Sequence, residues 1–225
     1  YLSKINAQRN FLTFAVYSTM FPYTSAGPII RYADIEEQLT HRSLNVSIFG
    51  LGAELFVKGL AKKVLLADNL SALYAGICGH SQMSVFTAWI GILAYTMQLY
   101  FDFSGYSDMA IGLGKRLGFD FNKNFDYPYI STSVSEFWRR WHISLGSWFR
   151  DYIYIPLGGN RVSTLKHVRN ILIVWALTGL WHGASWNFVL WGVYYGFFLL
   201  LEKFVLQGVL ERMPSWLRTV YTLLV

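Results

Sequence analysis

Cysteine is nearly absent from this chain of 225 residues, which contains Cys78 alone. A single cysteine excludes an internal disulfide and a metal site built from several thiolates, and we expect it to be a small packed residue. The sequence also lacks a His-Glu-x-x-His zinc motif and a Gly-x-Ser-x-Gly nucleophile motif. A dinucleotide loop at Gly112 and Gly114 is incomplete, because the position of its third glycine is occupied by Leu117. We therefore expect no metal ion and no tightly bound cofactor.

Charged residues are scarce as well, at 14% of the chain against 54% hydrophobic residues. Soluble domains have about 25% charged and 45–50% apolar residues. The nine tryptophans and fifteen tyrosines are typical of a membrane protein with aromatic side chains at the bilayer surface. The net charge of +6 comes from basic residues that flank apolar runs, which indicates contact with anionic lipid headgroups and gives no reason to expect nucleic acid. The composition predicts a polytopic membrane protein, and the helical segments described below, with the family resemblance that follows them, make the expected fold all-α.

No signal-peptide pattern, internal repeat or low-complexity tract is visible. The chain starts at Tyr1 without a methionine and stops at Val225 within an apolar run. We expect residues 1–225 to form a single transmembrane domain, a fragment of a larger core that is truncated at both ends.

The first third of the chain alternates between apolar and polar segments. Residues 10–30 are uncharged and long enough to cross a bilayer, but Pro22 and Pro28 interrupt them, so we expect a broken or re-entrant segment. Residues 31–42 are polar and predict a loop or a short surface helix. Residues 44–70 have helical periodicity, and their lysines mark either a helix end at the membrane surface or an ordinary solvated face.

Residues 84–101 form an uncharged run of eighteen that predicts a transmembrane helix. The run leads into Asp102 and Asp108, and Gly105 between them predicts that the helix bends or ends. The six-residue separation of the two aspartates does not place them on one helical face. We expect each to be a hydrogen-bond partner at a helix contact or to line a site.

A polar loop is expected over residues 119–133, followed by an amphipathic helix over residues 134–149. In such a helix Trp138 and His142 would share one apolar face, while Glu136 and Arg140 would form an i, i+4 pair on another.

Residues 170–201 contain no charged side chain. As one helix they would be about 48 Å long at about 1.5 Å per residue, whereas a bilayer core is about 30 Å thick. The run must therefore fold into two segments, with the turn at or just after His182, and the second helix is expected to end at Glu202. Residues 215–225 are expected to open a further span.

A histidine in such an apolar setting is costly unless it is paired or used. The neutral imidazole is a suitable general base near pH 7 because its ordinary pKa is about 6.5. Burial among tryptophans would favour the neutral form. His182 and His142 are therefore the candidate catalytic residues, with a hydrogen-bonded structural histidine as the alternative for each.

Several motifs resemble those of the membrane-bound O-acyltransferase family. They are Ala-Gly-Pro-Ile-Ile-Arg at 26–31, Lys-Lys-Val-Leu-Leu-Ala-Asp at 62–68, Tyr-Phe-Asp-Phe-Ser-Gly-Tyr-Ser-Asp-Met-Ala-Ile-Gly at 100–112, Glu-Phe-Trp-Arg-Arg-Trp-His-Ile-Ser-Leu at 136–145, Phe-Arg-Asp-Tyr-Ile-Tyr-Ile-Pro-Leu-Gly-Gly-Asn-Arg at 149–161 and Gly-Leu-Trp-His-Gly at 179–183. The resemblance extends from about residue 23 to residue 202 and is to the bacterial branch. Residues 156–161 look more like the alginate-acetylating members than the D-alanyl-transferring ones.

The resemblance implies a helical fold around a tunnel through the inner membrane, with a cytoplasmic acyl donor such as acetyl-CoA or another thioester. It implies that His182 is the catalytic histidine. His142 is at the second signature position, which is Asn or Asp in many eukaryotic relatives, and would orient the acceptor or polarise the carbonyl. Supporting or channel-lining roles are expected for seven further residues: Trp181, Trp138, Asp102, Asp108, Arg139, Arg140 and Asn170.

Three functions stay open at this point. The first is an enzyme that acetylates an exported polysaccharide or a downstream secreted acetyltransferase. The second is an acyl relay or transport protein without the final transfer chemistry, or a D-alanyl transferase for teichoic acid. The third is a non-catalytic scaffold, for which both histidines would be dispensable.

Overall fold

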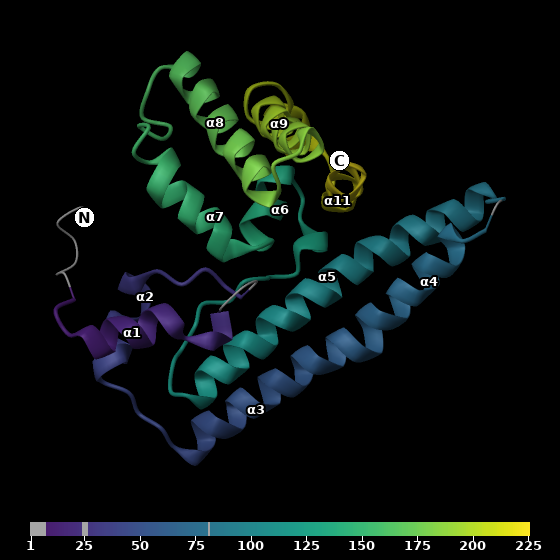
Figure 1. Ribbon diagram of the computed structural model, residues 1–225. Helices are drawn as coiled ribbons and strands as arrows, with labels where there is room; N and C mark the ends of the chain where they lie inside the picture. Colours follow the sequence, from purple (N-terminus) through teal and green to yellow (C-terminus); the bar gives the residue numbers. More distant parts are fainter. Residues whose placement is uncertain (1–7, 24–26, 81) are drawn as a thin grey trace. The chain divides into compact units, whose positions relative to one another are not determined.

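The computed structural model describes residues 8–23, 27–80 and 82–225, and every regular element within these ranges is helical. The prediction of an all-α fold is therefore confirmed. The chain divides into two compact units, Tyr1–Lys123 and Asn124–Val225 (Figure 1). The organisation of residues 1–225 as one domain stays a prediction.

The first unit begins with a short helix, α1 (Phe11–Thr19). The side chain of Asn10 caps it by accepting hydrogen bonds from the next turn. The helix stops at Met20, which is extended, and a 3₁₀ turn follows over Phe21–Tyr23. The predicted interruption of residues 10–30 is therefore confirmed, although its Thr24, Ser25 and Ala26 lie outside the described residues.

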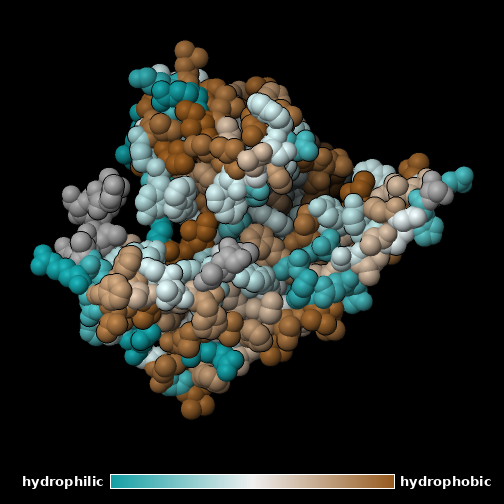
Figure 2. Space-filling model, viewed as in Figure 1, coloured by the Kyte–Doolittle hydropathy of each residue, from teal (hydrophilic) through white to brown (hydrophobic). Residues whose placement is uncertain are grey.

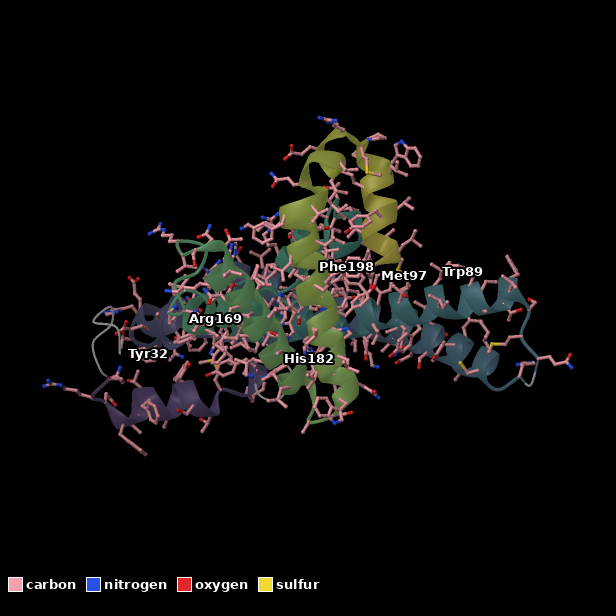
Figure 3. The ribbon with its side chains drawn as sticks, turned by 90° about the horizontal axis from the view of Figure 1, so that it is seen from above. Tyr32, Trp89, Met97, Arg169, His182 and Phe198 are labelled. Carbon is pink, nitrogen blue, oxygen red and sulfur yellow. The ribbon has the colours of Figure 1, made fainter. Side chains whose placement is uncertain are left out.

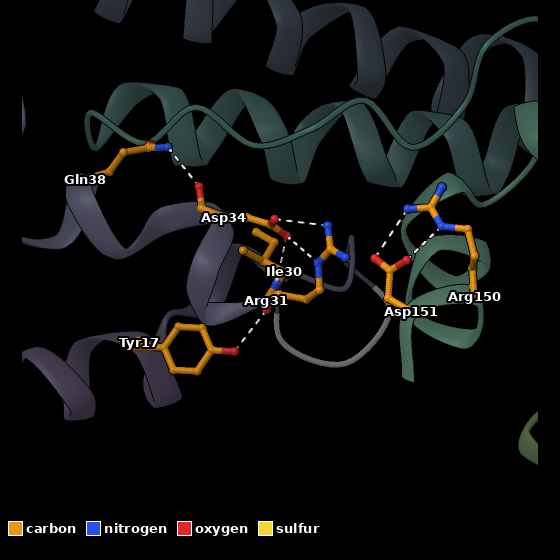
Figure 4. A network of polar contacts seen from close by, with 7 residues as sticks. All are labelled: Tyr17, Ile30, Arg31, Asp34, Gln38, Arg150 and Asp151. Carbon is orange, nitrogen blue, oxygen red and sulfur yellow. Dashed lines mark hydrogen bonds and ion pairs between the residues drawn. The ribbon is translucent and has the colours of Figure 1, made fainter. Parts of the chain in front are cut away.

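Polar contacts fix the segment that leads into α2 (Tyr32–Thr40), the predicted short polar helix (Figure 4). The Tyr17 hydroxyl donates to the Ile30 carbonyl at 3.0 Å, and the Arg31 guanidinium pairs with Asp34 at 3.0 Å. The apolar side of α2 joins a small buried cluster that contains Met20, Ile35, Leu39, Ile111, Phe119 and Phe121.

A long helical hairpin forms the rest of this unit. One arm consists of α3 (Val46–Ala61), a π-helical segment (Lys62–Ala67) and α4 (Asp68–Cys78), and it packs along the other arm, α5 (Val85–Arg116) (Figure 1). The helical periodicity predicted for residues 44–70 is confirmed, and the first arm continues beyond them to Cys78.

Of the bend or end predicted at Gly105, the end is wrong, because α5 is continuous to Arg116. The glycines serve close packing between the two arms instead. A Cβ atom on Gly105 would lie 2.7 Å from the Gly59 carbonyl oxygen, and one on Gly112 would lie 2.7 Å from the Gly52 carbonyl oxygen. Tertiary contact at these positions outweighs the low intrinsic helix propensity of glycine.

Both aspartates of α5 form ion pairs with the π-helical segment of the opposite arm. Lys62 contacts Asp108 at 2.6 Å, and Lys63 contacts Asp102 at 2.8 Å and Asp68 at 2.8 Å. Of the two roles expected for Asp102 and Asp108, these contacts support the holding of helices.

In the second unit a polar loop leads to α6 (Val134–Arg140) and α7 (Ile143–Phe149), followed by a π-helical segment (Arg150–Tyr154). The prediction of a single helix over residues 134–149 is wrong. The chain breaks at Trp141, which is extended, and at His142, which has a left-handed backbone with φ +47°. No right-handed helix can include that conformation.

Two antiparallel helices complete the site-bearing part of this unit: α8 (Thr164–His182) and α9 (Trp186–Leu201). The turn predicted at or just after His182 is confirmed. The predicted end at Glu202 is wrong, because a π-helical segment (Glu202–Leu206) and α10 (Gln207–Arg212) continue the helix. The last helix is α11 (Ser215–Leu224).

Large apolar side chains are exposed on the long helices of both units, as the hydropathy colouring of Figure 2 shows. On α5 they include Trp89 and Met97 (Figure 3), and on α9 they include Leu190 and Phe197. Within the described ranges, one helical stretch, Trp186–Arg212, is long and apolar enough to cross a membrane. The multi-pass arrangement therefore stays a prediction.

Candidate active site

His182 is the last residue of α8, and one contact determines which ring nitrogen carries its proton (Figure 3). Its Nδ1 atom lies 2.8 Å from the carbonyl oxygen of Thr178, one turn earlier in the helix. A carbonyl oxygen can only accept a hydrogen bond, so Nδ1 of the neutral ring must be protonated. Nε2 then carries the lone pair, which is the requirement for a general base.

Aromatic rings surround the His182 imidazole. The ring centroids of Trp191 and Trp181 lie 4.8 Å and 4.9 Å from it, and Phe188 stacks at 6.4 Å. The His182 side chain is nevertheless exposed, and Trp181 is 55% exposed. The expected burial among tryptophans is therefore wrong for His182.

His142 is the buried histidine of the pair, with 6% of its surface exposed. It occupies the break between two seven-residue helices. Burial, with a smaller contribution from the nearby His182, lowers the pKa of His142 to about 4. The imidazole is therefore neutral across the physiological pH range.

Asn124 organises the backbone at this break. Its carbonyl oxygen accepts a hydrogen bond from the Ile143 N–H at 2.9 Å, and its Oδ1 accepts one from the Ser144 N–H at 3.1 Å. These are the first N–H groups of α7, which have no partner within the helix. A residue eighteen positions earlier in the chain thus caps α7 and stabilises the left-handed His142.

The structure brings the two candidate histidines to one place, because Trp181 contacts both. The Trp181 ring centroid lies 6.1 Å from that of His142 and 4.9 Å from that of His182. Both pairs meet edge to face, a favourable arrangement of aromatic rings. Trp181 therefore lies against both histidines, and its supporting role stays a prediction.

Trp138 packs in an aromatic cluster beside this pair, with Trp175, Trp191 and Tyr195 at 4.8–5.6 Å. Trp191 also contacts His182, so the cluster is continuous with the site. The Nε1 atom of Trp138 is buried and has no hydrogen-bond partner. Trp138 therefore lies among aromatic rings, and its role in shaping a dry channel stays a prediction.

Arg140 and Asn170 each donate hydrogen bonds from a helix to backbone carbonyl groups of a neighbouring loop or turn. Arg140 pairs with Glu136 at 2.8 Å, as predicted, and its Nη1 donates to the Asp126 carbonyl oxygen at 3.0 Å. Asn170 is fully buried and donates to the carbonyl oxygens of Leu157 and Gly159 at 3.0 and 3.1 Å. Arg139 is exposed at the end of α6. The supporting roles expected for these three residues stay predictions.

The sequence reasoning missed Glu202, a buried carboxylate that holds α6 in place. Its two oxygens accept hydrogen bonds from the N–H groups of Val134 at 2.6 Å and Ser135 at 3.0 Å. A negative charge at a helix N-terminus is favourable. The sequence feature that could have identified Glu202 is its position, because it is a single acidic residue directly after thirty-two uncharged residues.

Asn124, Ser144 and Thr178 were missed as well, and no spacing pattern in the sequence points to them. Among the described residues, no group of three or more His, Cys, Asp or Glu side chains is placed to hold a metal ion. The site instead consists of two imidazoles, aromatic side chains and hydrogen-bonding groups that contact the rings. Such an arrangement is suited to moving a proton to or from a bound hydroxyl.

These features define an all-helical protein with exposed apolar helices and two neighbouring histidines among aromatic side chains. The chain belongs to the membrane-bound O-acyltransferase (MBOAT) family, whose profile matches residues 5–223.

Three relatives illustrate the similarity. The probable alginate O-acetylases of Azotobacter vinelandii and Pseudomonas aeruginosa are 50% and 47% identical over 88% and 97% of the chain. The peptidoglycan O-acetyltransferase of Helicobacter pylori is 42% identical over 86% of it. The chain spans about two fifths of the length of these relatives, with 40%, 42% and 38% of them covered.

Proposed function

We propose that the complete protein is a multi-pass O-acyltransferase of the inner membrane that moves an acetyl group from a cytoplasmic thioester to an exported polysaccharide. The acceptor is either a hydroxyl of the polysaccharide or a downstream secreted acetyltransferase. The observation that carries this proposal is the contact of Trp181 with both His142 and His182. In a member of an acyltransferase family, this contact supports a general-base role for His182 beside a second, buried imidazole.

In the proposed reaction, Nε2 of His182 removes the proton of the acceptor hydroxyl while the hydroxyl oxygen attacks the thioester carbonyl. The tetrahedral intermediate then collapses, the carbon–sulfur bond breaks, and the proton passes from His182 to the departing thiolate. The products are an ester and a free thiol, so the proton and the electron pairs balance. General-base assistance of this kind contributes about 10²- to 10⁴-fold to the rate.

The hydrogen bond from Nδ1 to the Thr178 carbonyl supports this role of His182. It fixes the orientation of the ring and stabilises the imidazolium that forms when Nε2 takes the proton. The exposed side of His182 leaves access for the acceptor and the donor.

The choice of acetyl group and polysaccharide comes from the relatives. Those with 42–50% identity are named for O-acetylation of alginate or peptidoglycan. This supports an acetyl thioester donor, such as acetyl-CoA, over a D-alanyl donor. It leaves the particular polysaccharide as a question for experiment.

A substitution of His182 tests the proposal directly. In the full-length protein in lipid vesicles, His182→Ala should reduce acetyl transfer from a labelled thioester to background while membrane insertion is unchanged. His80→Ala, at an exposed histidine that follows α4, is the matched control and should retain full activity. Retained transfer by His182→Ala would refute the assignment.

A second measurement separates final transfer from relay. Purified full-length protein that acetylates an oligosaccharide by itself performs the final transfer. If label instead accumulates only on a secreted partner protein, the chain acts as a relay and the polysaccharide is not its direct acceptor.

A further inference from the structure

We propose that a pocket in the first unit binds an anionic phospholipid, with the headgroup phosphate on Arg42 and an acyl chain along the apolar wall of the pocket. None of the lining residues belongs to the histidine site. The proposal therefore goes beyond acyl transfer and does not depend on it.

Three segments of the first unit form the pocket. They are α1, the connection between α2 and α3, and the residues that follow α5 (Figure 1). The pocket has a volume of about 590 Å³, and small-molecule sites in proteins have volumes of about 300–1,000 Å³. The space is therefore sufficient for a ligand larger than a single ion.

The wall of the pocket is mostly apolar. Val16, Leu44 and Leu117 line it and are exposed, whereas Phe119 is 2% exposed. The Phe119 ring stacks on that of Phe121 at 5.9 Å within the buried cluster of this unit, so the core fixes this part of the wall. Removal of apolar surface from water is favourable, and a membrane-bound protein has lipid acyl chains beside it. An acyl chain is therefore a suitable occupant.

Arg42 places a positive charge on this apolar wall. Its guanidinium carbon lies 4.8 Å from the centroid of the Phe119 ring, a cation–π contact that holds the side chain at the pocket. Arg42 forms no ion pair in the part of the chain that the structure describes. Asp120, which follows Phe119, pairs with Lys115 at 2.7 Å. The charge of Arg42 is thus available to an anionic ligand.

A phosphate group matches this charge. The planar guanidinium presents parallel N–H donors that bind two phosphate oxygens at once. The hydroxyl of Thr19, the other polar side chain named above α2 in the lining, already donates to the Ala15 carbonyl oxygen at 2.7 Å. The Thr19 oxygen can still accept, which suits a headgroup that carries hydroxyl groups, as phosphatidylglycerol does.

An anionic phospholipid satisfies both features of the pocket. Inorganic phosphate would pair with Arg42 and leave the apolar wall in water, and an uncharged lipid would cover the wall and leave Arg42 unpaired. A zwitterionic lipid has a phosphate, but its own cation offsets the charge. One basic residue near a membrane surface favours anionic lipid by about 5-fold in binding. We therefore expect a preference of about this size for phosphatidylglycerol over phosphatidylcholine.

Native mass spectrometry of the full-length protein in detergent tests the charged half of the proposal. The probes are phosphatidylglycerol and phosphatidylcholine with identical acyl chains, and the readout is the fraction of protein that retains each lipid. Arg42→Gln should reduce the 5-fold preference to nearly none, whereas Arg42→Lys keeps the charge and should retain most of it. Arg212→Gln, at an exposed arginine at the end of α10, is the matched control and should leave the preference unchanged.

Leu44→Trp tests the apolar half without a change of charge. The larger side chain should fill the pocket and weaken the binding of both lipids. Leu51→Trp is the matched control, because Leu51 is an exposed leucine of α3 that does not line the pocket. Thermal unfolding in the same detergent verifies that each variant is folded.

The proposal is overturned if Arg42→Gln keeps the preference for phosphatidylglycerol, or if Leu44→Trp binds both lipids as well as the unsubstituted protein does. Displacement of phosphatidylglycerol by equimolar inorganic phosphate would also overturn it, because the phosphate ion alone would then be a sufficient occupant. Acetyl transfer enters none of these readouts, so failure of the lipid site and failure of the proposed function are distinguishable.

Discussion

His142 adopts a left-handed backbone conformation, which is uncommon for residues other than glycine. Histidine, asparagine and aspartate are the residues most enriched there, and they are also the types that the family resemblance gives for this position. The side chain can therefore be placed at the break between α6 and α7 without glycine. Backbone geometry limits which residue types are tolerated here, in addition to any requirement of the chemistry.

The lowered pKa of His142 predicts a specific loss of stability in acid. Its folded-state pKa of about 4 lies below the ordinary value of 6.5, so between these values the unfolded chain binds a proton that the folded chain does not. Stability is unaffected above pH 6.5 and falls as the pH drops toward 4, by about 3 kcal/mol at most.

The measurement is thermal unfolding of the full-length protein in detergent at pH 7.5 and pH 4.5. His142→Asn, which tolerates the same backbone conformation, should lose less stability between the two pH values than the unsubstituted protein. An equal loss in both proteins would contradict the lowered pKa.

The sequence was sufficient to find His182 and insufficient to place His142. The uncharged residues 170–201 are too long to cross a bilayer as one helix, so the sequence required a turn at or just after His182. The structure has the turn at that position. His142 was expected on a helical face, since the periodicity of residues 134–149 fits one. Its real position depends on caps from Asn124, a contact between distant residues that no local pattern reveals.

At the scale of elements, the hairpin of α3 and α5 depends on glycines that face each other. A Cβ atom on Gly59 would lie 2.5 Å from the Gly105 carbonyl oxygen, which is closer than real contacts allow. The sequence suggested close helix contacts from the glycines of α5. It could not show which ones face the partner helix, because that depends on the register of the two arms.

Two alanine substitutions on the same helix should have opposite effects. Gly59→Ala should destabilise the hairpin by about 1–3 kcal/mol through overpacking. Gly50→Ala has open space around its new Cβ atom and should stabilise α3 by up to about 1 kcal/mol through helix propensity. Thermal unfolding of the two variants checks this, and equal effects would show that the arms do not pack as described.

Glu202 connects two elements of the site, because it lies at the end of α9 and caps the start of α6. Glu202→Gln removes the charge, and the neutral amide has one oxygen where two N–H groups need acceptors. We expect a loss of about 1–3 kcal/mol and reduced acetyl transfer, since α6 leads directly to His142.

Glu211→Gln, at an exposed glutamate of α10, is the control for this change and should be neutral in both assays. Full stability and activity in Glu202→Gln would mean that the buried carboxylate does not hold α6.

At the scale of the whole molecule, the chain spans about two fifths of the length of its relatives. The composition was enough to predict an all-helical membrane protein, and motifs were enough to predict the family. The π-helical segments at Lys62–Ala67 and Glu202–Leu206 could not be predicted, because each occurs where a charged residue contacts another helix.

The central claim is that His142 and His182 act together on one acyl transfer, and a double-mutant cycle tests it most directly. Acetyl transfer is measured for the full-length protein with His182→Ala, His142→Asn and both substitutions. Residues that act as a unit give non-additive effects. The account predicts that the double variant is no less active than His182→Ala alone, with both at background. Substantial transfer by His182→Ala, or a His142→Asn effect that multiplies fully with it, would contradict the shared site.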